Sequence, residues 1–397
     1  MISIQGQYGK PENKLRSKMK IKGFMCLILF SVGCSLAPPN KIIQALESAP
    51  FFETQMLFEG ERFPNIVVTT DGSVVATWGQ KNCVSRRSID GGAKWEPLVN
   101  IDQGINGGGL TVDENSGNLI TFLEKGKHPP APILSYISKD QGASWKAHPI
   151  EIHRDKNGNL PSMHMNEHGI TLRKGKYKGR LLRTTRFYSQ GNEKSYWPEH
   201  YANAIFSDDE GKTWYSSDPF PTNGTGEAAV VELENGTLYY NSRRHLSTDG
   251  LNPRMRHIAT SNNGGQRWDS LYVSNELPDG EQNGDYGLMA GLDRLPFKGY
   301  DLLIFSNIES NKGRKNGTVW LSFDAGKSWP IKKQIDPEGF KYSSLTVGRK
   351  NTPSEGYIYL LYETGKKEDI NAYGGGKIVR FNLSWLMEGK NINQYLK

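Results

Sequence analysis

The stretch Ser207-Asp-Asp209-Glu-Gly211-Lys-Thr-Trp214 is one of five copies of the pattern Ser-x-x-x-Gly-x-x-Trp, with Asp or Asn at the third position. The other four copies, which we call boxes, occupy residues 88–95, 138–145, 261–268 and 322–329. An Asp or Asn side chain closes a turn by accepting backbone N–H groups about two residues ahead, and glycine supplies the positive φ that the turn needs. We therefore expect each box to be a β-hairpin loop with its Trp folded underneath as an apolar plug.

A second repeat predicts the number of structural units. Six glycines each open a short β-prone run, namely Gly72, Gly117, Gly179, Gly236, Gly299 and Gly356. Five of these runs precede a box, and the sixth is followed by residues 374–381, which we expect to be a closing strand. Such self-similarity, at intervals of roughly 50 to 70 residues, is typical of radial repeats. The sequence predicts an all-β fold, a six-bladed β-propeller with five box hairpins and paired chain ends, and short helices only at 40–47 and 383–388.

The N-terminal segment reads as an export signal. A Lys-rich stretch precedes the apolar run 24–30, which is too short to span a bilayer, and small residues lead up to Cys34. We expect residues 1–34 to be a signal peptide of the bacterial lipoprotein type, with Met19 as an alternative start and an uncleaved anchor as the alternative reading. Residues 35–44 are then a linker and 45–397 one propeller domain. The expected location is the periplasm, outer membrane or cell surface, with membrane contact only through a lipid at Cys34.

Charge and cysteine content exclude other classes. Residues 1–34 carry six Lys or Arg and one acidic residue, which is +5 of the net charge of +7. The remainder is close to neutral, so a nucleic-acid partner, which needs clustered Lys and Arg, is not expected. Cys83 is the only cysteine after the leader; it cannot form an internal disulfide, and we expect it to be buried as a small hydrophobe. We expect a monomer without a cofactor.

Polar side chains stand at the ends of the predicted inner strands, where a propeller has its funnel. Arg62, Arg243 and Arg314 come from different blades, with Arg244 as an alternative to Arg243. Three arginines in one funnel would be a poor structure unless an anion sat among them, and guanidinium forks match a carboxylate. The other candidate residues at these positions are Glu227, Tyr342 and Glu363.

With these residues, the chain resembles the bacterial sialidase (neuraminidase) family over nearly its whole mature length. The boxes are similar to that family's Asp boxes, or BNR repeats, and Arg62-Phe-Pro64 is similar to its Arg-Ile-Pro motif. The resemblance implies that Arg62, Arg243 and Arg314 bind the substrate carboxylate and that Glu363 supports Arg62. It also implies that Tyr342 is the nucleophile and that Glu227 is catalytic.

The implied activity is that of a glycoside hydrolase, an exo-α-sialidase acting on a sialylated glycan. A sialic acid carries its carboxylate on the anomeric carbon, so a neutral phenol can approach where a carboxylate nucleophile would be repelled, and sialidases are the known tyrosine exception among glycosidases. A free tyrosine has a pKa near 10 and needs a base, which Glu227 would supply. The arginines would also stabilise the transition state by fixed charge.

One departure concerns the proton donor. The family carries an acid/base aspartate after its first inner strand, but residues 78–87 contain no Asp or Glu. The candidate substitutes are His164, Glu167 and Asp285. His164 and His168 are four residues apart and would suit a metal only on a helix; since a loop and strand are expected there, no metal is predicted.

Two other functions stay open because of this missing acid. One is a propeller enzyme for another acidic sugar, either a uronic-acid glycosidase or a lyase. The other is a non-catalytic propeller that binds sialoglycans.

Overall fold

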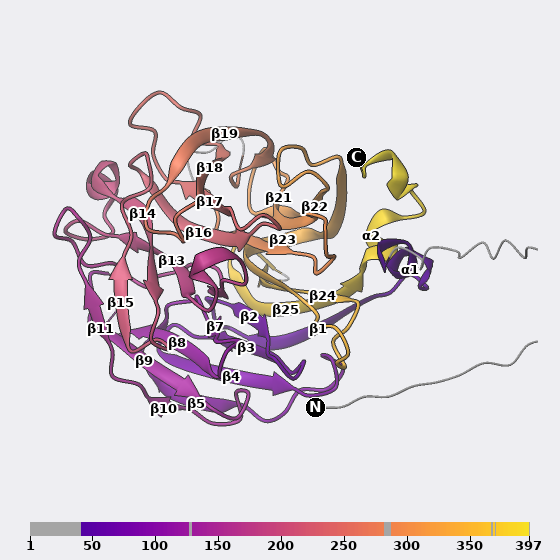
Figure 1. Ribbon diagram of the computed structural model, residues 1–397, viewed down its shortest axis with the longest axis horizontal. Coiled ribbons are helices and arrows are strands. Elements are labelled where there is room, and N and C mark those ends of the chain that lie inside the picture. The colour runs from indigo at the N-terminus through magenta and orange to yellow at the C-terminus, as the bar shows by residue number, and fades with distance from the viewer. Residues whose placement is uncertain (1–40, 127–128, 282–286, 367, 370, 397) are drawn as a thin grey trace, which may run out of the picture. The chain divides into compact units, whose positions relative to one another are not determined.

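The structure is a computed structural model that describes residues 41–126, 129–281, 287–366, 368–369 and 371–396 (Figure 1). Within these residues, 25 strands are accompanied by only two short α-helices and three 3-10 helices. The all-β prediction is therefore confirmed.

Hydrogen bonding groups the strands into five sheets. The first has the order β2 (Asn65–Val68), β3 (Val74–Trp78), β4 (Asn82–Ser88), β5 (Val99–Gln103). The second has the order β10 (Lys146–Ala147), β9 (Ile133–Ser138), β8 (Leu119–Glu124), β6 (Ile105–Asn106), with β7 (Thr111–Val112) also paired to β8. The third has the order β11 (Glu151–His153), β15 (Thr213–Ser216), β14 (Tyr201–Ser207), β13 (Leu181–Phe187), β12 (Ile170–Thr171). The fourth has the order β16 (Thr225–Glu232), β17 (Leu238–Arg244), β18 (Met255–Ser261), β19 (Asp269–Pro278).

The fifth sheet has seven strands and contains the first and the last of the described strands. Its order is β1 (Phe52–Glu59), β25 (Tyr373–Asn382), β24 (Tyr357–Gly365), β23 (Ile331–Val347), β22 (Lys315–Ser322), β21 (Leu303–Ile308), β20 (Gly291–Arg294). The long strand β23 pairs with β22 through its N-terminal half and with β24 through its C-terminal half, so two four-stranded groups share it. The antiparallel pairing of β1 with β25 confirms that the chain ends pair, and β25 contains the predicted closing strand.

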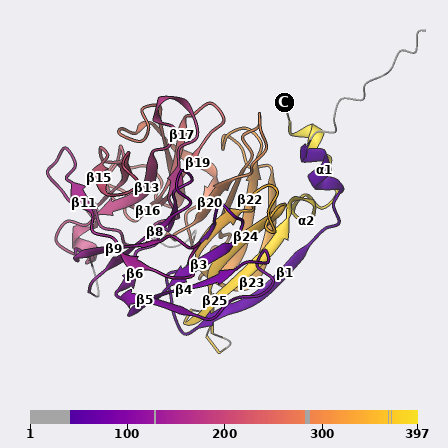
Figure 2. The same ribbon diagram turned by 60° about the horizontal axis from the view of Figure 1, so that its bottom comes forward.

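The inner strands of successive groups contact one another, and in the third sheet β13, the second strand, makes the contact with β16. β2 contacts β7, β7 contacts β12, β13 contacts β16, β16 contacts β20, β20 contacts β23, and β23 contacts β2 again. In Figure 1 the labels β2, β7, β16 and β23 lie toward the middle, and β5, β10, β15 and β19 lie at the periphery; Figure 2 shows the same unit from another side. The inner strands therefore share one central region, and side chains at their ends can meet there.

The predicted strand-opening glycines each precede the second strand of a group. These strands are β3, β8, β13, β17, β21 and β24. All six glycines have φ between 79° and 94°, the left-handed region that an L side chain rarely adopts. The repeat signal in the sequence is therefore a turn from each inner strand into the next strand.

The boxes form hairpin turns, as predicted, but with different hydrogen bonds. In every box the Ser hydroxyl accepts the N–H of the box glycine, and the third residue accepts a backbone N–H four positions ahead. In the third box, the Gly211 N–H reaches Ser207 Oγ at 3.0 Å and the Thr213 N–H reaches Asp209 Oδ1 at 2.9 Å. The prediction of an N–H two residues ahead was wrong, because the serine takes that donor.

The box tryptophans link neighbouring sheets. Trp214 is fully buried and packs edge-on against Phe122 of β8, at a ring-centroid distance of 5.5 Å. Trp145 donates its indole N–H to Ser85 Oγ of β4 at 2.9 Å. The apolar plug therefore stabilises the contact between adjacent sheets as well as its own hairpin.

Both predicted helices are present, as α1 (Lys41–Glu47) and α2 (Leu383–Met387), and the 3-10 helices are η1 (Gly175–Tyr177), η2 (Lys194–Glu199) and η3 (Ile392–Gln394). Ile42 of α1 and Leu386 of α2 are buried in one apolar cluster. Cys83 is buried, as expected. None of the helices in the described ranges is long and apolar enough to cross a membrane. The predicted leader and Cys34 lie outside the described residues.

Candidate active site

Tyr342 of β23 and Glu227 of β16 meet in the central region although they are 115 residues apart in the sequence. The Tyr342 hydroxyl donates to Glu227 Oε1 at 2.9 Å. Arg243, at the end of β17, donates from Nη1 to Tyr342 Oη at 3.1 Å and to Glu227 Oε2. The structure thus brings the predicted nucleophile, the predicted base and one predicted arginine into direct contact.

Shifts in strand pairing occur at both Glu227 and Tyr342 and set the direction of their side chains. The register of β16 against β17 shifts between Thr225 and Ala228, and Glu227 lies in this interval. The register of β23 against β24 shifts between Phe340 and Ser343, the interval that contains Tyr342. β-Bulges are frequent next to active sites because they redirect a side chain that regular pairing would fix.

The charges around the pair determine its protonation. Burial alone would raise the pKa of Glu227, but Arg243 and Arg186 and the hydrogen bonds from Arg243 and Tyr342 outweigh burial and hold that pKa below its usual value. Burial and the charge of Glu227 raise the pKa of Tyr342 to about 12, against the opposing effect of the arginines. At neutral pH, Glu227 is therefore an ionised acceptor and Tyr342 a neutral phenol.

Two further arginines face the same tyrosine. The Arg62 guanidinium carbon lies 5.4 Å from the centroid of the Tyr342 ring, and that of Arg314 lies 5.7 Å from it. Glu363, at the end of β24, binds Arg62 at two points, with distances of 3.1 and 3.3 Å. Tyr373, which the sequence analysis did not single out, covers Arg62 with its ring at 3.7 Å. The predicted Arg62, Arg243 and Arg314 thus converge on one phenol.

The structure distinguishes Arg243 from its neighbour Arg244. Successive side chains on a strand point to opposite faces. Arg244 binds Asp249 at 3.0 Å and the carbonyl oxygen of Leu246 at 2.9 Å, away from Tyr342. Arg243 is therefore the arginine of the candidate site.

Sequence reasoning missed a fourth arginine. Arg186, near the end of β13, is buried and its Nη1 lies 4.0 Å from Glu227 Oε1. The same Nη1 lies 2.8 Å from Tyr188 Oη and 3.1 Å from His245 Nε2, while Nη2 lies 2.9 Å from His200 Nδ1. Burial, together with the charge of Arg186, lowers the pKa of His200 to about 3 and that of His245 well below its usual value. Both imidazoles are therefore neutral and can accept from this guanidinium.

A signal for the missed residues was present in the sequence. Arg243 and Glu363 each stand seven residues after the glycine that opens their strand, and Arg186 and Glu124 have the same offset. Equal offsets place the four side chains at equivalent ends of second strands. The repeat could therefore have identified Arg186 and Glu124.

The structure describes two of the three candidate proton donors. Asp285 lies outside the described residues. Glu167 is fully buried and its Oε1 accepts from Ser344 Oγ at 2.8 Å and from the Leu345 N–H at 2.9 Å, further along β23 than Tyr342. Burial raises its pKa well above the usual value, although these hydrogen bonds act in the opposite direction. Glu167 is thus held inside the fold, where it ties β23 to its neighbours.

His164 lies beside the candidate site. Its ring packs edge-on against Phe63, the residue after Arg62, at 5.4 Å between centroids. Its Nδ1 lies 3.8 Å from Glu124 Oε2. His168 lies elsewhere, with its ring nitrogens 3.2 Å from the Gly169 carbonyl oxygen and 3.1 Å from that of Leu345. In the described part of the chain, no three His, Cys, Asp or Glu residues are grouped so as to hold a metal ion.

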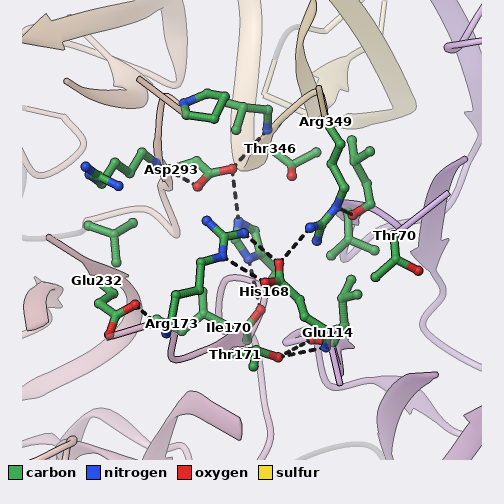
Figure 3. Close-up of a pocket in the computed structure, with 18 of the residues that line it drawn as sticks. Thr70, Glu114, His168, Ile170, Thr171, Arg173, Glu232, Asp293, Thr346 and Arg349 are labelled. Atoms are coloured by element: carbon green, nitrogen blue, oxygen red, sulfur yellow. Dashed lines mark hydrogen bonds and ion pairs between the residues drawn. The ribbon is translucent and has the colours of Figure 1, made fainter. Parts of the chain in front are cut away.

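A cavity of about 410 Å³ opens at the opposite end of the inner strands (Figure 3). Figure 3 shows Arg173 and Arg349 directed at Glu114, whose Oε1 lies 2.6 and 2.7 Å from them. Glu232 accepts the Arg173 backbone N–H at 2.6 Å. In this cavity, Glu114 is thus paired with two arginines. Around Tyr342, the four arginines described above face two glutamates, an excess of positive charge that suits an anion.

Comparison with known proteins agrees with this description. Residues 106–360 match the family described as BNR repeat-like domain. The chain is 28% identical over 369 residues to a sialidase of Micromonospora viridifaciens, which covers 83% of this chain and 52% of that protein. It is also 28% identical over 355 residues to a sialidase of Bacteroides fragilis strain YCH46, which covers 76% of this chain and 60% of that protein.

A solved structure shares the fold. The Hadza microbial sialidase Hz136 superposes with a TM-score of 0.61 at 24% sequence identity, which covers 82% of this chain and 66% of that one. The chain spans only about half to three fifths of the length of the two curated relatives.

Proposed function

The chain belongs to the family of BNR repeat-like domains, and on that premise we propose that it is an exo-α-sialidase, a glycoside hydrolase that removes terminal sialic acid from glycans. One observation carries the proposal: a neutral buried tyrosine donates to an ionised glutamate among converging arginines. Sialidases are the glycosidases in which tyrosine is the nucleophile. The two curated sialidases that the chain resembles support the same function.

Tyr342 is assigned as the nucleophile and Glu227 as its base. As Tyr342 Oη forms a bond to the anomeric carbon, its proton passes to Glu227, and the bond from that carbon to the leaving oxygen breaks. Water then attacks the same carbon as its bond to Tyr342 Oη breaks, and the proton on Glu227 returns to the tyrosine. The proton that the water loses balances the one that the leaving oxygen gains. Because Tyr342 is neutral at rest, it approaches the substrate carboxylate without charge repulsion.

Arg62, Arg243 and Arg314 are assigned to the substrate carboxylate. Their fixed positive charge would orient the sugar and stabilise the oxocarbenium-like transition state without reorganisation of solvent. Glu363 is assigned to hold Arg62, since its carboxylate binds two nitrogens of that guanidinium.

We further propose that the sheets form a six-bladed propeller. The sharing of β23 between two four-stranded groups supports counting the seven-stranded sheet as two blades. The contacts of the inner strands, which return from β23 to β2, support a ring. The site would then lie where the inner strands begin.

The test is release of free sialic acid from sialyllactose, followed by mass spectrometry. We expect activity from the wild type and a loss of at least about 10³-fold in Tyr342→Phe, as for other nucleophile deletions. Tyr272→Phe, at a tyrosine on β19 that is 40% exposed, is the matched control and should keep full activity. Full activity of Tyr342→Phe would remove the mechanism, and a wild type inactive on all sialosides would remove the function.

The first sheet lacks an acidic residue where a proton donor was expected, so two other functions need a test of their own. β3 and β4 are joined by residues 79–81 alone, and residues 78–88 contain no Asp or Glu. An unsaturated product from a polyuronate would identify a uronic-acid lyase, and release of a uronic acid would identify a glycosidase of that class. Sialoside binding without any product would identify a glycan-binding protein.

We also propose export and lipidation at Cys34, which rest on the sequence of residues 1–34. Labelled palmitate should enter the wild type and the Cys83→Ala control but not Cys34→Ala. Equal labelling of Cys34→Ala would exclude the anchor.

A further inference from the structure

This inference rests on the proposed hydrolysis, in which the leaving oxygen of the glycan must gain a proton. Neither glutamate that contacts the arginines can supply it. Glu227 accepts from Tyr342 and Arg243, and Glu363 accepts from Arg62 and from the Phe63 N–H at 3.0 Å. Both act as carboxylate acceptors, so the donor must be another residue.

His164 is connected to Tyr342 through one aromatic ring. The Phe63 ring lies 6.4 Å from the Tyr342 ring and 5.4 Å from the His164 ring, measured between centroids. Phe63 follows Arg62 in the chain and so belongs to the same wall of the site. On this side, His164 lies one ring away from the nucleophile.

His164 is also connected to Glu227 by a second route. Its ring packs against Tyr188 at 6.0 Å, and the Tyr188 hydroxyl accepts from Arg186 Nη1 at 2.8 Å. The same nitrogen lies 4.0 Å from Glu227 Oε1. Together with the contacts through Phe63, these contacts connect the nucleophile, its base and His164 in one ring of neighbouring residues.

A buried glutamate lies beside the His164 ring. Glu124, at the end of β8, is fully buried and accepts from Ser162 Oγ and from the Met163 N–H at 2.8 Å. Glu124 Oε2 lies 3.8 Å from Nδ1 of His164. A carboxylate near Nδ1 favours the protonated imidazole by its charge, and Nε2 is then the nitrogen assigned to the transfer. The side chain of His164 is 11% exposed.

The backbone beside Arg62 and beside His164 has an unusual conformation. Phe63 has φ of 68° and Met165, the residue after His164, has φ of 53°. Non-glycine residues rarely occupy this region, and those that do concentrate at functional sites where the surrounding structure fixes them. Both residues are buried, so the positions of Arg62 and His164 are set by packing.

We propose that His164 is the proton donor to the leaving oxygen, with Glu124 as its positioning residue. In the first step, the proton on Nε2 passes to the glycosidic oxygen as the bond from that oxygen to the anomeric carbon breaks and Tyr342 Oη bonds to the same carbon. In the second step, neutral His164 accepts a proton from the attacking water, and the bond to Tyr342 breaks. His164 thereby regains its starting protonation.

The proposal predicts different losses of activity on two kinds of substrate. Lactose is a poor leaving group and needs protonation, whereas 4-nitrophenolate leaves without it. We expect His164→Gln to lose at least about 100-fold in kcat/KM on sialyllactose but to stay within about fivefold on 4-nitrophenyl sialoside. His153→Gln is the matched control, since the side chain of His153 is 44% exposed, and it should act as wild type on both.

The pH profile tests Glu124. The charged groups that face His164 are Glu124 on β8 and, on β13, Arg186 behind Tyr188 and Arg183, whose Nη2 reaches the Met163 carbonyl oxygen at 3.4 Å. Glu124→Gln removes the only carboxylate among these groups while both arginines stay. The alkaline limb of kcat on sialyllactose should therefore move to lower pH in this variant.

Each outcome decides the matter. Equal losses on both substrates in folded His164→Gln, with thermal unfolding as for the wild type, would show a structural role and overturn the proposal. An unchanged alkaline limb in Glu124→Gln would overturn the role of Glu124. Wild-type protein inactive on both sialosides would instead overturn the proposed function.

Discussion

Arg62 and Glu363 are 301 residues apart in the sequence and form a two-point ion pair between the two groups of strands that adjoin at β2 and β23. The Glu363 carboxylate also accepts the Phe63 N–H at 3.0 Å. Paired guanidinium–carboxylate bonds fix orientation as well as charge. Glu363 therefore sets the direction in which Arg62 presents its guanidinium to Tyr342.

Glu363→Gln should weaken substrate binding more than it slows chemistry. The amide keeps the side-chain volume but loses the charge and one acceptor, so Arg62 is no longer fixed. We expect KM for sialyllactose to rise about 10-fold, from a loss of about 1–2 kcal/mol in the orienting contact. Glu338→Gln, at an exposed position, is the control. A lower melting temperature with unchanged KM would mean that Glu363 serves the fold alone.

Glu167→Gln should leave activity intact and change the pH dependence of stability. The pKa of Glu167 is raised well above its usual value, mainly by burial. A raised folded-state pKa contributes stability below the unfolded-state pKa, and this contribution is lost as the pH rises toward the folded-state value. The glutamine mimics the protonated acid, so we expect the variant to exceed the wild type in unfolding free energy at pH 8 and to match it near pH 4.

Urea unfolding at the two pH values, together with the sialyllactose assay, checks this prediction. Loss of activity with the fold retained would return Glu167 to consideration as a proton donor. A wild type more stable than the variant at pH 8 would contradict the reasoning about burial.

The repeats made the architecture predictable. The box glycines and the strand-opening glycines, such as Gly236, need a positive φ, and this need is visible in the sequence because few residues tolerate it. Arg243 and Glu363 could be located from the same repeat. The convergence of Tyr342 and Glu227 was foreseen only through the family resemblance.

What stayed hidden depends on contacts between distant segments. Arg186 reaches Glu227 because β13 contacts β16, the inner strand of the next sheet, and nothing in the sequence around either residue indicated that contact. His164 could not be separated from Glu167 by sequence, since only two residues lie between them and each could donate a proton. Only the burial of Glu167 against β23, and the position of His164 beside Phe63, distinguish the two.

Glu114→Gln should destabilise the fold at neutral pH but not in acid. Burial would raise the pKa of Glu114, yet Arg173 and Arg349 lower it to about 2. A depressed pKa contributes stability above the usual value near 4.5, and this is lost as the pH falls toward 2. We expect a loss of about 1–3 kcal/mol at pH 7, reduced because the Glu114 side chain is 20% exposed.

Unfolding free energies measured from pH 7 to pH 3 check this prediction. The difference between Glu114→Gln and the wild type should shrink steadily below about pH 4.5. Glu47→Gln, at an exposed position of α1, should show no such trend. A difference that is constant with pH would mean that the carboxylate charge is not what stabilises this end of the inner strands.

The boxes provide their own control for the last prediction. Asp209 accepts from the Thr213 N–H at 2.9 Å, and in the fourth box Asn263 accepts from the Arg267 N–H at 3.0 Å with the same geometry. Asp209→Asn should therefore keep the turn, whereas Asp209→Ala leaves that N–H without its acceptor and should cost about 1 kcal/mol. Urea midpoints of the two variants compare acceptor with no acceptor at one site. If alanine were as stable as asparagine there, the turn would rest on its glycine and on Trp214, and the third residue of the box would need another explanation.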